Sequence, residues 1–194
     1  MNKSTAEGLI NAFPQFFDHF KKKYKYPHSQ LSVGEGWSNL ICKMLIKLDY
    51  HRESVSKKYK KHGTTVTTDF VQIKEKFGTL RLYHNTTVEM EPKSHQRVRK
   101  IDMWIRDIMC RRGFAKAYWA FYRWRRRHFE TISEQVNTII GNAEAKSAKI
   151  CERCGEEGER CRPDYWVMTL CKKCENKLKK KGEQNDKLES GLHD

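Results

Sequence analysis

Four cysteines near the C-terminus have the residue type and spacing that could bind a metal ion. Cys151 and Cys154 form one Cys-x-x-Cys pair, and sixteen residues separate it from a second pair, Cys171 and Cys174. Each pair forms a tight knuckle that directs two sulfurs to one point, and two facing knuckles supply the ligands of a tetrahedral zinc site. Because four thiolates leave no position for water or substrate, the pattern predicts a structural Zn²⁺ ion.

The segment between the two pairs contains a fifth cysteine, Cys161, within Glu-Arg-Cys-Arg-Pro. The spacing leaves its role open, as a spare thiol or as an alternative ligand. Three apolar residues are expected to form a small core beneath the metal: Trp166, Val167 and Leu170. No signal peptide and no run near the ~18 apolar residues of a membrane span is visible, so we expect reduced thiols and a cytoplasmic location.

The most basic part of the chain precedes the metal module. Between Arg97 and His128, eleven Lys and Arg residues occur with only two Asp residues, in a chain of net charge +15. Arginines that contact phosphates and aromatic side chains that stack on bases are typical of nucleic-acid-binding surfaces. Phe114 and Tyr118 are expected to be core residues of the same helix. The candidate binding residues are Arg111, Arg112, Lys116, Trp119, Arg123, Trp124, Arg125, Arg126 and Arg127.

The same composition suits an acidic protein partner, because arginine and aromatic residues are also enriched at protein interfaces. A diverged metal-dependent nuclease of the HNH type is the one enzymatic alternative. However, no histidine lies between Cys154 and Cys171, where its general base would be needed. The sequence has no P-loop, G-x-S-x-G or His-Glu-x-x-His motif. It therefore predicts a non-enzymatic protein without catalytic residues, a small-molecule substrate or a membrane partner.

Hydrophobic periodicity predicts an α+β fold that is mainly helical. Residues 5–23 form an amphipathic pattern that Pro14 should interrupt, and a second helix should begin at Gly34-Glu-Gly-Trp37. Residues 51–65 are expected to be turn-like. Alternation on both sides of Glu75-Lys-Phe-Gly78 predicts a β-hairpin.

The helical period returns near Lys93, and a long helix should run from about Ala115 into the metal module. A short third strand is also expected over residues 86–92. These elements predict four regions along the chain. They are a helical and hairpin domain (1–92), a basic aromatic helical pair (93–149), a zinc-ribbon-like module (150–178) and a disordered tail (179–194).

Several short segments occur in a characteristic order. They are Gly34-Glu-Gly-Trp37, Gln72-Ile-Lys-Glu-Lys-Phe-Gly-Thr-Leu-Arg81, Ala143-Glu144 with Ser147, Cys151-Glu-Arg-Cys-Gly-Glu-Glu-Gly158, and Trp166 with Thr169-Leu-Cys-Lys-Lys-Cys174. This ordered set covers roughly half the chain and resembles a family of small proteins encoded by bacteriophages and prophages. The resemblance implies a phage origin and a zinc-binding module, and it implies no biochemical role.

Two partner classes follow from these observations. The basic aromatic helix would bind nucleic acid, or the protein would inhibit or modulate a host protein, as part of a defence system or the transcription machinery. In both cases it would act in the host bacterial cytoplasm. The stretch from Lys100 to Phe129 is longer than the family pattern requires, which makes it the segment expected to carry what is particular to this protein.

Overall fold

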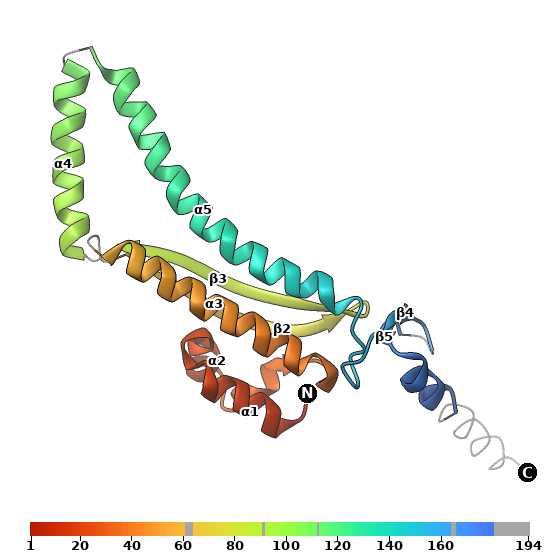
Figure 1. Cartoon of the computed structure of the whole chain (residues 1–194). Helices are drawn as coiled ribbons and strands as arrows, with labels where there is room; N and C mark the ends of the chain where they lie inside the picture. Colours follow the sequence, from red (N-terminus) through yellow and green to blue (C-terminus); the bar gives the residue numbers. More distant parts are fainter. Residues whose placement is uncertain (61–63, 91, 112, 164–165, 181–194) are drawn as a thin grey trace, which may run out of the picture. The chain divides into compact units, whose positions relative to one another are not determined.

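The computed structural model describes most of the chain and shows an α+β fold, as predicted (Figure 1). It forms two compact units. Unit 1 consists of Met1–Ile46, Asp69–Asn85 and the chain from Ile139 onwards, and unit 2 consists of Lys47–Thr68 and Thr86–Thr138. The described residues are 1–60, 64–90, 92–111, 113–163 and 166–180, without some of the side chains between positions 90 and 130.

Helices account for most of the described residues, and the strands form two small sheets. The α-helices are α1 (Lys3–Ala12), α2 (Asp18–Lys23), α3 (Ser38–Lys58), α4 (Pro92–Arg111) and α5 (Ala115–Ser147), with short 3₁₀ helices η1 (Pro14–Phe16), η2 (Pro27–Gln30) and η3 (Glu35–Trp37). The strands are β1 (Leu31–Ser32), β2 (Thr64–Lys76), β3 (Thr79–Met90), β4 (Glu159–Cys161) and β5 (Met168–Leu170). Residues 172–180 are also helical.

The larger sheet has the order β1-β2-β3, and β1 pairs in parallel with β2 so that Leu31 lies opposite Ile73. Phe77 and Gly78 connect β2 to β3, and both have positive φ (54° and 71°), as a type I′ hairpin turn requires. The predicted hairpin is therefore confirmed. The predicted third strand over 86–92 is wrong: residues 86–90 continue β3, because neither Gly nor Pro interrupts the chain before Pro92.

The core of unit 1 contains the aromatic residues that the N-terminal pattern predicted. Pro14 ends the first helix, as expected, and the chain continues as η1 and then α2. The Phe17 ring lies 5.5 Å from the Phe20 ring and 5.8 Å from the Phe70 ring, measured between centroids. Burial of several large side chains from helix and strand supplies the hydrophobic stabilisation of this unit. The fully buried ones include Phe16, Phe17, Phe20, Trp37, Ile41, Leu45, Phe70, Ile73 and Leu80.

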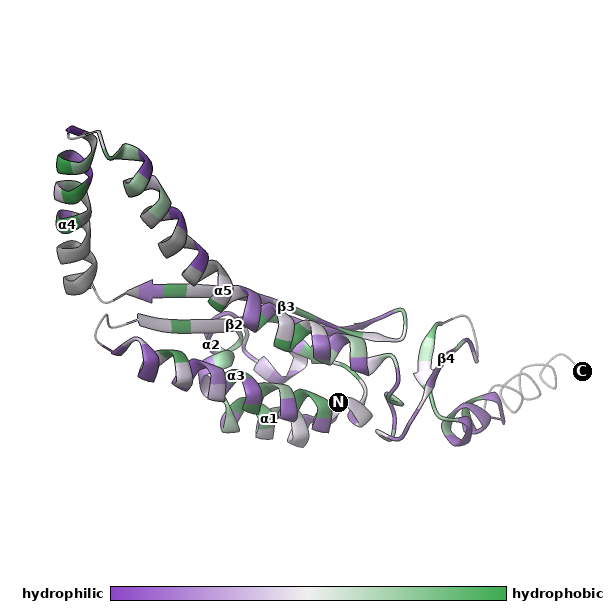
Figure 2. Ribbon diagram, turned by 45° about the horizontal axis from the view of Figure 1, so that its top comes forward, coloured by the Kyte–Doolittle hydropathy of each residue, from purple (hydrophilic) through white to green (hydrophobic). Residues whose placement is uncertain are grey.

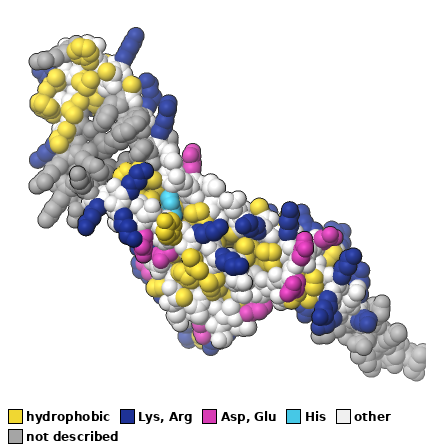
Figure 3. Space-filling model, viewed as in Figure 1, with side chains coloured by type: hydrophobic (Ala, Val, Ile, Leu, Met, Phe, Trp, Pro, Cys, Tyr) yellow, Lys and Arg dark blue, Asp and Glu magenta, His cyan; other side chains and the backbone are white. Residues whose placement is uncertain are grey.

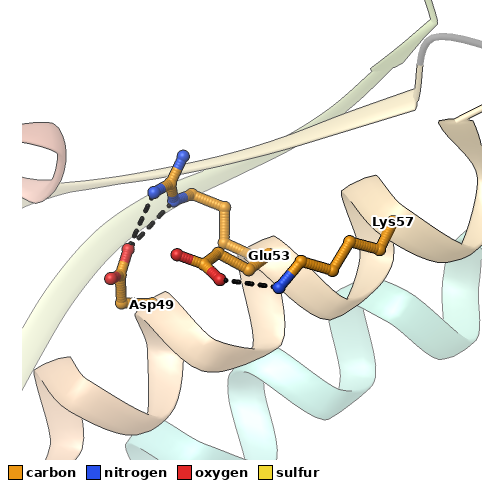
Figure 4. Close-up of polar contacts among 4 residues, drawn as sticks. Asp49, Glu53 and Lys57 are labelled. Carbon is orange, nitrogen blue, oxygen red and sulfur yellow. Dashed lines mark hydrogen bonds and ion pairs between the residues drawn. The ribbon is translucent and has the colours of Figure 1, made fainter.

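Helix α3 extends to Lys58, so the prediction that residues 51–65 are turn-like is wrong for their first half. No glycine or proline occurs in this part of the helix. Side-chain pairs one helical turn apart also support it (Figure 4): Arg52 lies 2.9 Å from Asp49, and Lys57 lies 3.1 Å from Glu53. Such pairs stabilise an exposed helix by about 0.2–0.5 kcal/mol each.

Candidate metal centre

The four predicted ligands lie together at the end of unit 1. The sulfurs of Cys151, Cys154, Cys171 and Cys174 are all within 4.8 Å of one another, and the Cys154 and Cys171 sulfurs are 3.6 Å apart. A tetrahedral metal with bonds of about 2.3 Å to sulfur requires sulfurs about 3.8 Å apart. The structure therefore brings these cysteines close enough to hold one metal ion, and four protein ligands would close the site.

Backbone amides make the first knuckle suitable for thiolate ligands. Gly155, at φ 83°, closes the turn by donating to the Cys151 carbonyl oxygen at 2.9 Å. Burial opposes ionisation of Cys151, but the N–H groups of Cys171, Cys154 and Arg153 outweigh it and lower the pKa of Cys151 to about 7. The site thus favours a thiolate at its buried end.

The second knuckle shows why these sulfurs need a cation. In this turn the amide of Cys174 donates to the Cys171 carbonyl oxygen at 3.0 Å. Burial raises the pKa of Cys174 to about 12, together with the neighbouring sulfurs of Cys171, Cys154 and Cys151. Four thiolates at this separation repel one another, and the positive charge of a bound metal ion would offset that repulsion as the ion displaces the thiol protons.

The fifth cysteine lies outside this cluster. Cys161 ends β4, opposite Met168 of β5, and among the described residues the metal-binding group contains only the other four cysteines of the module. Burial raises the pKa of the Cys161 thiol. The two-stranded sheet of β4 and β5 thus leads the chain from one knuckle to the other.

The module has a different core from the one predicted. Trp166 is 77% exposed, so its assignment to the core beneath the metal is wrong, whereas Leu170 is buried as expected. Thr169 is fully buried as well. The physical reason is that the module packs against other parts of unit 1 through Thr169, whose hydroxyl donates to the Gly78 carbonyl oxygen, and this contact buries Thr169.

The segment Gly34-Glu-Gly-Trp37 holds the first knuckle. The amide of Gly36 donates to the Glu152 carbonyl oxygen at 2.8 Å, and the Trp37 indole N–H donates to the Ile150 carbonyl oxygen at 2.8 Å. A Cβ atom at Gly36 would lie 2.1 Å from the Cys151 carbonyl oxygen. Only glycine permits so close a backbone approach.

The hairpin turn holds the strand that precedes the second knuckle. The Thr169 hydroxyl donates to the Gly78 carbonyl oxygen at 2.5 Å, and the Arg160 guanidinium donates to the Phe77 carbonyl oxygen at 2.6 Å. A Cβ atom at Gly78 would lie 2.9 Å from the Met168 carbonyl carbon. The turn therefore needs glycine for its contact with β5 as well as for its positive φ.

The last turns of α5 protect the edge of the hairpin that leads into this turn. The amides of Leu80 and Leu82 donate to the Ser147 hydroxyl and to the Glu144 carboxylate, each at 2.8 Å. These groups complete hydrogen bonds that an edge strand would leave open. The short segments that occur in a characteristic order along the sequence thus form the candidate metal centre or contact the residues around it.

The sequence predicted a helix start at Gly34-Glu-Gly-Trp37 and a β-hairpin around Gly78, but it did not predict that either segment contacts the metal module. The sequence did contain a signal for this contact. Gly34 and Gly36 flank a single residue just before a helix, and glycines in such a position indicate that another backbone segment approaches closely. The pattern could not show that the approaching backbone belongs to Cys151 and Glu152.

Glu152 is a buried carboxyl beside the metal ligands, with 7% of its surface exposed. Burial is the main cause that raises its pKa to about 7, and the charge of Glu75 contributes in the same direction. In the unfolded chain the value returns to about 4.5. Between these values the folded protein holds a proton that the unfolded chain has lost, so stability falls as the pH rises from about 4.5 to 7.

Glu152→Gln should therefore be more stable than the wild type above pH 7, where the wild-type carboxyl is ionised. The difference between the two proteins should shrink towards pH 5. Urea unfolding of the metal-loaded proteins at pH 5 and pH 8 measures it. Glu159→Gln changes an exposed carboxyl of the same module and serves as the control. Equal pH dependence of Glu152→Gln and wild type would contradict the prediction.

Apart from Arg112, the predicted binding residues lie on α4 and α5 of unit 2. Arg111 is exposed and lies 3.1 Å from Asp107, and Trp119 is 51% exposed. Tyr118 is buried as expected, but Phe114 is 60% exposed, because it precedes α5 and no described element covers it. Lys116, Arg123 and Arg127 are exposed, whereas Arg112 and the side chains of Trp124, Arg125 and Arg126 lie outside the described residues, as does the predicted tail beyond residue 180.

Among the described residues, no helix is both long enough and apolar enough to cross a membrane. Comparisons of the chain with known protein families, with curated proteins and with solved structures give no match.

Proposed function

We propose that the protein is a zinc-stabilised nucleic-acid-binding protein in which α5 contacts phosphates. One observation carries this proposal: Lys116, Arg123 and Arg127 are exposed and follow each other at seven and four residues. On an α-helix they fall within about 40° of one another and span about 16 Å. Tyr118, which is buried, lies on the opposite face of the same helix. We call the three cations the α5 stripe.

The charge around the α5 stripe supports a polyanionic partner. Within the described part of the chain, no carboxylate forms an ion pair with any of its three members. Duplex DNA carries one negative charge for about 1.7 Å of its axis, so a stripe of about 16 Å can contact several phosphates. Trp119, half exposed and adjacent on the helix, is suited to stacking on an unpaired base. Figure 3 shows Lys and Arg side chains along this helix.

Zinc is the metal that we propose for the four cysteines. Tetrahedral four-sulfur sites favour Zn²⁺ or iron–sulfur chemistry, and paired Cys-x-x-Cys knuckles at this spacing are typical of zinc. Because all four ligands come from the protein, the ion would stabilise unit 1 and leave binding to α5.

Salt dependence tests the nucleic-acid proposal. The variant Lys116→Ala/Arg123→Ala/Arg127→Ala should bind duplex DNA more weakly at low salt. The slope of log K against log salt concentration should become shallower by about 2.7, because each lost phosphate contact contributes about 0.9. Fluorescence anisotropy across a salt series measures both quantities.

A charge-matched variant separates the α5 stripe from net charge. Lys21, Lys22 and Lys23 are three exposed lysines of α2 in unit 1. Their replacement by alanine removes the same charge and should leave the salt slope within experimental error of wild type. If both triple variants lose the same affinity, binding depends on overall charge and the α5 stripe is not the site.

A host-protein inhibitor is the second candidate function, and the surface of α4 favours it. Ile101 and Trp104 are 53% and 66% exposed, and Ile105 and Ile108 remain partly exposed at the next positions of the same face. Figures 2 and 3 show hydrophobic residues on this helix. Exposed tryptophan beside aliphatic residues is typical of protein interfaces.

Affinity capture from a nuclease-treated bacterial lysate tests this second function. Wild type should retain one host protein in stoichiometric amount, and Trp104→Glu should lose it while keeping DNA affinity. Equal recovery by both proteins would exclude α4 as the contact surface.

A further inference from the structure

Unit 1 contains a cavity beside the metal module that the proposed function does not use. Its volume is about 510 Å³, within the range of about 300–1,000 Å³ that small-molecule sites occupy. The segment from η2 through β1 to Gly34 forms one side of the cavity, and Glu75 of β2 and Glu152 of the first knuckle also line it. All of these residues belong to unit 1.

Glu152 gives this cavity a buried hydrogen-bond acceptor without a partner. Its side chain is more than nine-tenths buried, and Oε2 is buried without a hydrogen-bond partner. Its backbone is held on both sides, because its amide donates to the Thr169 carbonyl oxygen at 2.9 Å and its carbonyl oxygen accepts from Gly36 at 2.8 Å. A buried carboxylate oxygen in a fixed position, without a partner, is costly unless a ligand supplies the missing contact.

A second carboxylate lines the same cavity. Glu75 lies on the cavity wall together with Glu152, and its Oε1 accepts from the Gly78 amide at 2.6 Å. The cations at the cavity have other partners: Lys3 lies 3.8 Å from Glu7, and the Met1 amino group donates to the Val33 carbonyl oxygen. Within the described residues, no ion pair joins a Lys or Arg to either carboxylate.

The chemistry of this pair favours an organic cation over a metal ion. Among the described residues, only the four cysteines bring three or more metal-binding atoms together, so the cavity lacks the ligand number that a divalent ion needs. An ammonium or guanidinium group needs only charge and hydrogen-bond acceptors, and a guanidinium can bond two carboxylates at once. We propose that this cavity binds an alkylammonium or guanidinium group between Glu75 and Glu152.

Isothermal titration of the metal-loaded protein with agmatine, which carries both groups, tests this site. One molecule should bind to each chain, and Glu75→Gln and Glu152→Gln should each weaken binding at least tenfold. Glu159→Gln makes the same charge change at an exposed position of the module and should bind as wild type. Lys3→Ala removes a cation that lines the cavity without pairing with Glu75 or Glu152, and this variant should bind at least as tightly as wild type.

A second probe identifies the source of the cation, and folding controls accompany each variant. Acetylarginine amide, if it binds with the same glutamate dependence, indicates that an arginine of a peptide is accepted, and binding of agmatine alone indicates a free amine. Circular dichroism and zinc content verify each variant, and Glu75→Gln keeps a side-chain oxygen for Gly78 if Glu152→Gln fails to fold. Absence of binding by both probes, unchanged affinity in both glutamine variants, or glutamate-dependent binding of Mg²⁺ alone would overturn the proposal.

Discussion

Cys171→Ser is expected to leave unit 1 without a stable fold at 25 °C. A structural zinc ion contributes on the order of 10–16 kcal/mol to the folding of a small module. That amount matches or exceeds the whole stability of an ordinary domain, about 5–15 kcal/mol. Zinc release, followed with a colorimetric chelator, and thermal unfolding, followed by circular dichroism, measure the effect. EDTA treatment of the wild type should reproduce it.

The expected loss should extend beyond the knuckles because other parts of unit 1 rest on them. Gly36 and Trp37 donate to the backbone of the first knuckle, and the hairpin turn at Gly78 accepts from Thr169. Without the metal these donors and acceptors would lose their fixed partners. Hydrogen exchange of the β2–β3 hairpin should therefore accelerate together with that of the module.

Cys161→Ser is the matched control, because this thiol lies in the same module but outside the four-sulfur cluster. It should keep one zinc per chain and a melting temperature close to wild type. A Cys171→Ser protein that retains one zinc and melts like the wild type would contradict the assignment of the ligands.

Gly36→Ala is expected to destabilise unit 1 by about 3 kcal/mol or more, at the upper end of overpacking costs. The added methyl group would lie 2.1 Å from the Cys151 carbonyl oxygen and 2.4 Å from the Gly155 amide nitrogen. Both are backbone atoms of the metal-binding knuckle, so neither can turn away as a flexible side chain would. The knuckle would have to move, and the geometry of the sulfurs would change with it. Urea unfolding and zinc affinity measure the two consequences.

Gly141→Ala is the control, and it should change the stability in the opposite direction. Gly141 lies inside α5, and a Cβ atom there would meet nothing within 4 Å. The change should stabilise the protein by up to about 1 kcal/mol, because glycine is a poor helix former. A Gly36→Ala variant that loses less than 1 kcal/mol would show that the close approach of η3 to the knuckle is not needed for stability.

Most of the secondary structure could be predicted because periodicity is a local property. The break at Pro14, the turn at Gly78 and the long helix from Ala115 follow from residues that are near one another in sequence. The failures have local causes too. Residues 51–58 contain many charged side chains, and this polarity suggests a loop. On a helix, however, Asp49 and Arg52 are spaced to form an ion pair.

The exposure of individual side chains and their contacts with distant segments could not be predicted in the same way. Trp166 was expected in the core because tryptophan is usually buried, yet its neighbours leave it in solvent and bury Thr169 instead. Which residue is covered depends on what packs against the module, and here those contacts come from more than sixty residues away in sequence, as between Gly78 and Thr169.

The sequence by itself determined the four candidate metal ligands and the basic character of α5, because closely spaced cysteine pairs mark a possible metal site and the charge of a segment follows from its composition. Only the tertiary structure decided that Gly36 and Gly78 support the metal centre, and that Glu75 and Glu152 share a cavity. It also placed Lys116, Arg123 and Arg127 on an exposed face of a helix whose other side is buried. The physical reason is that packing between distant segments depends on the shape of the whole fold, which no local pattern contains.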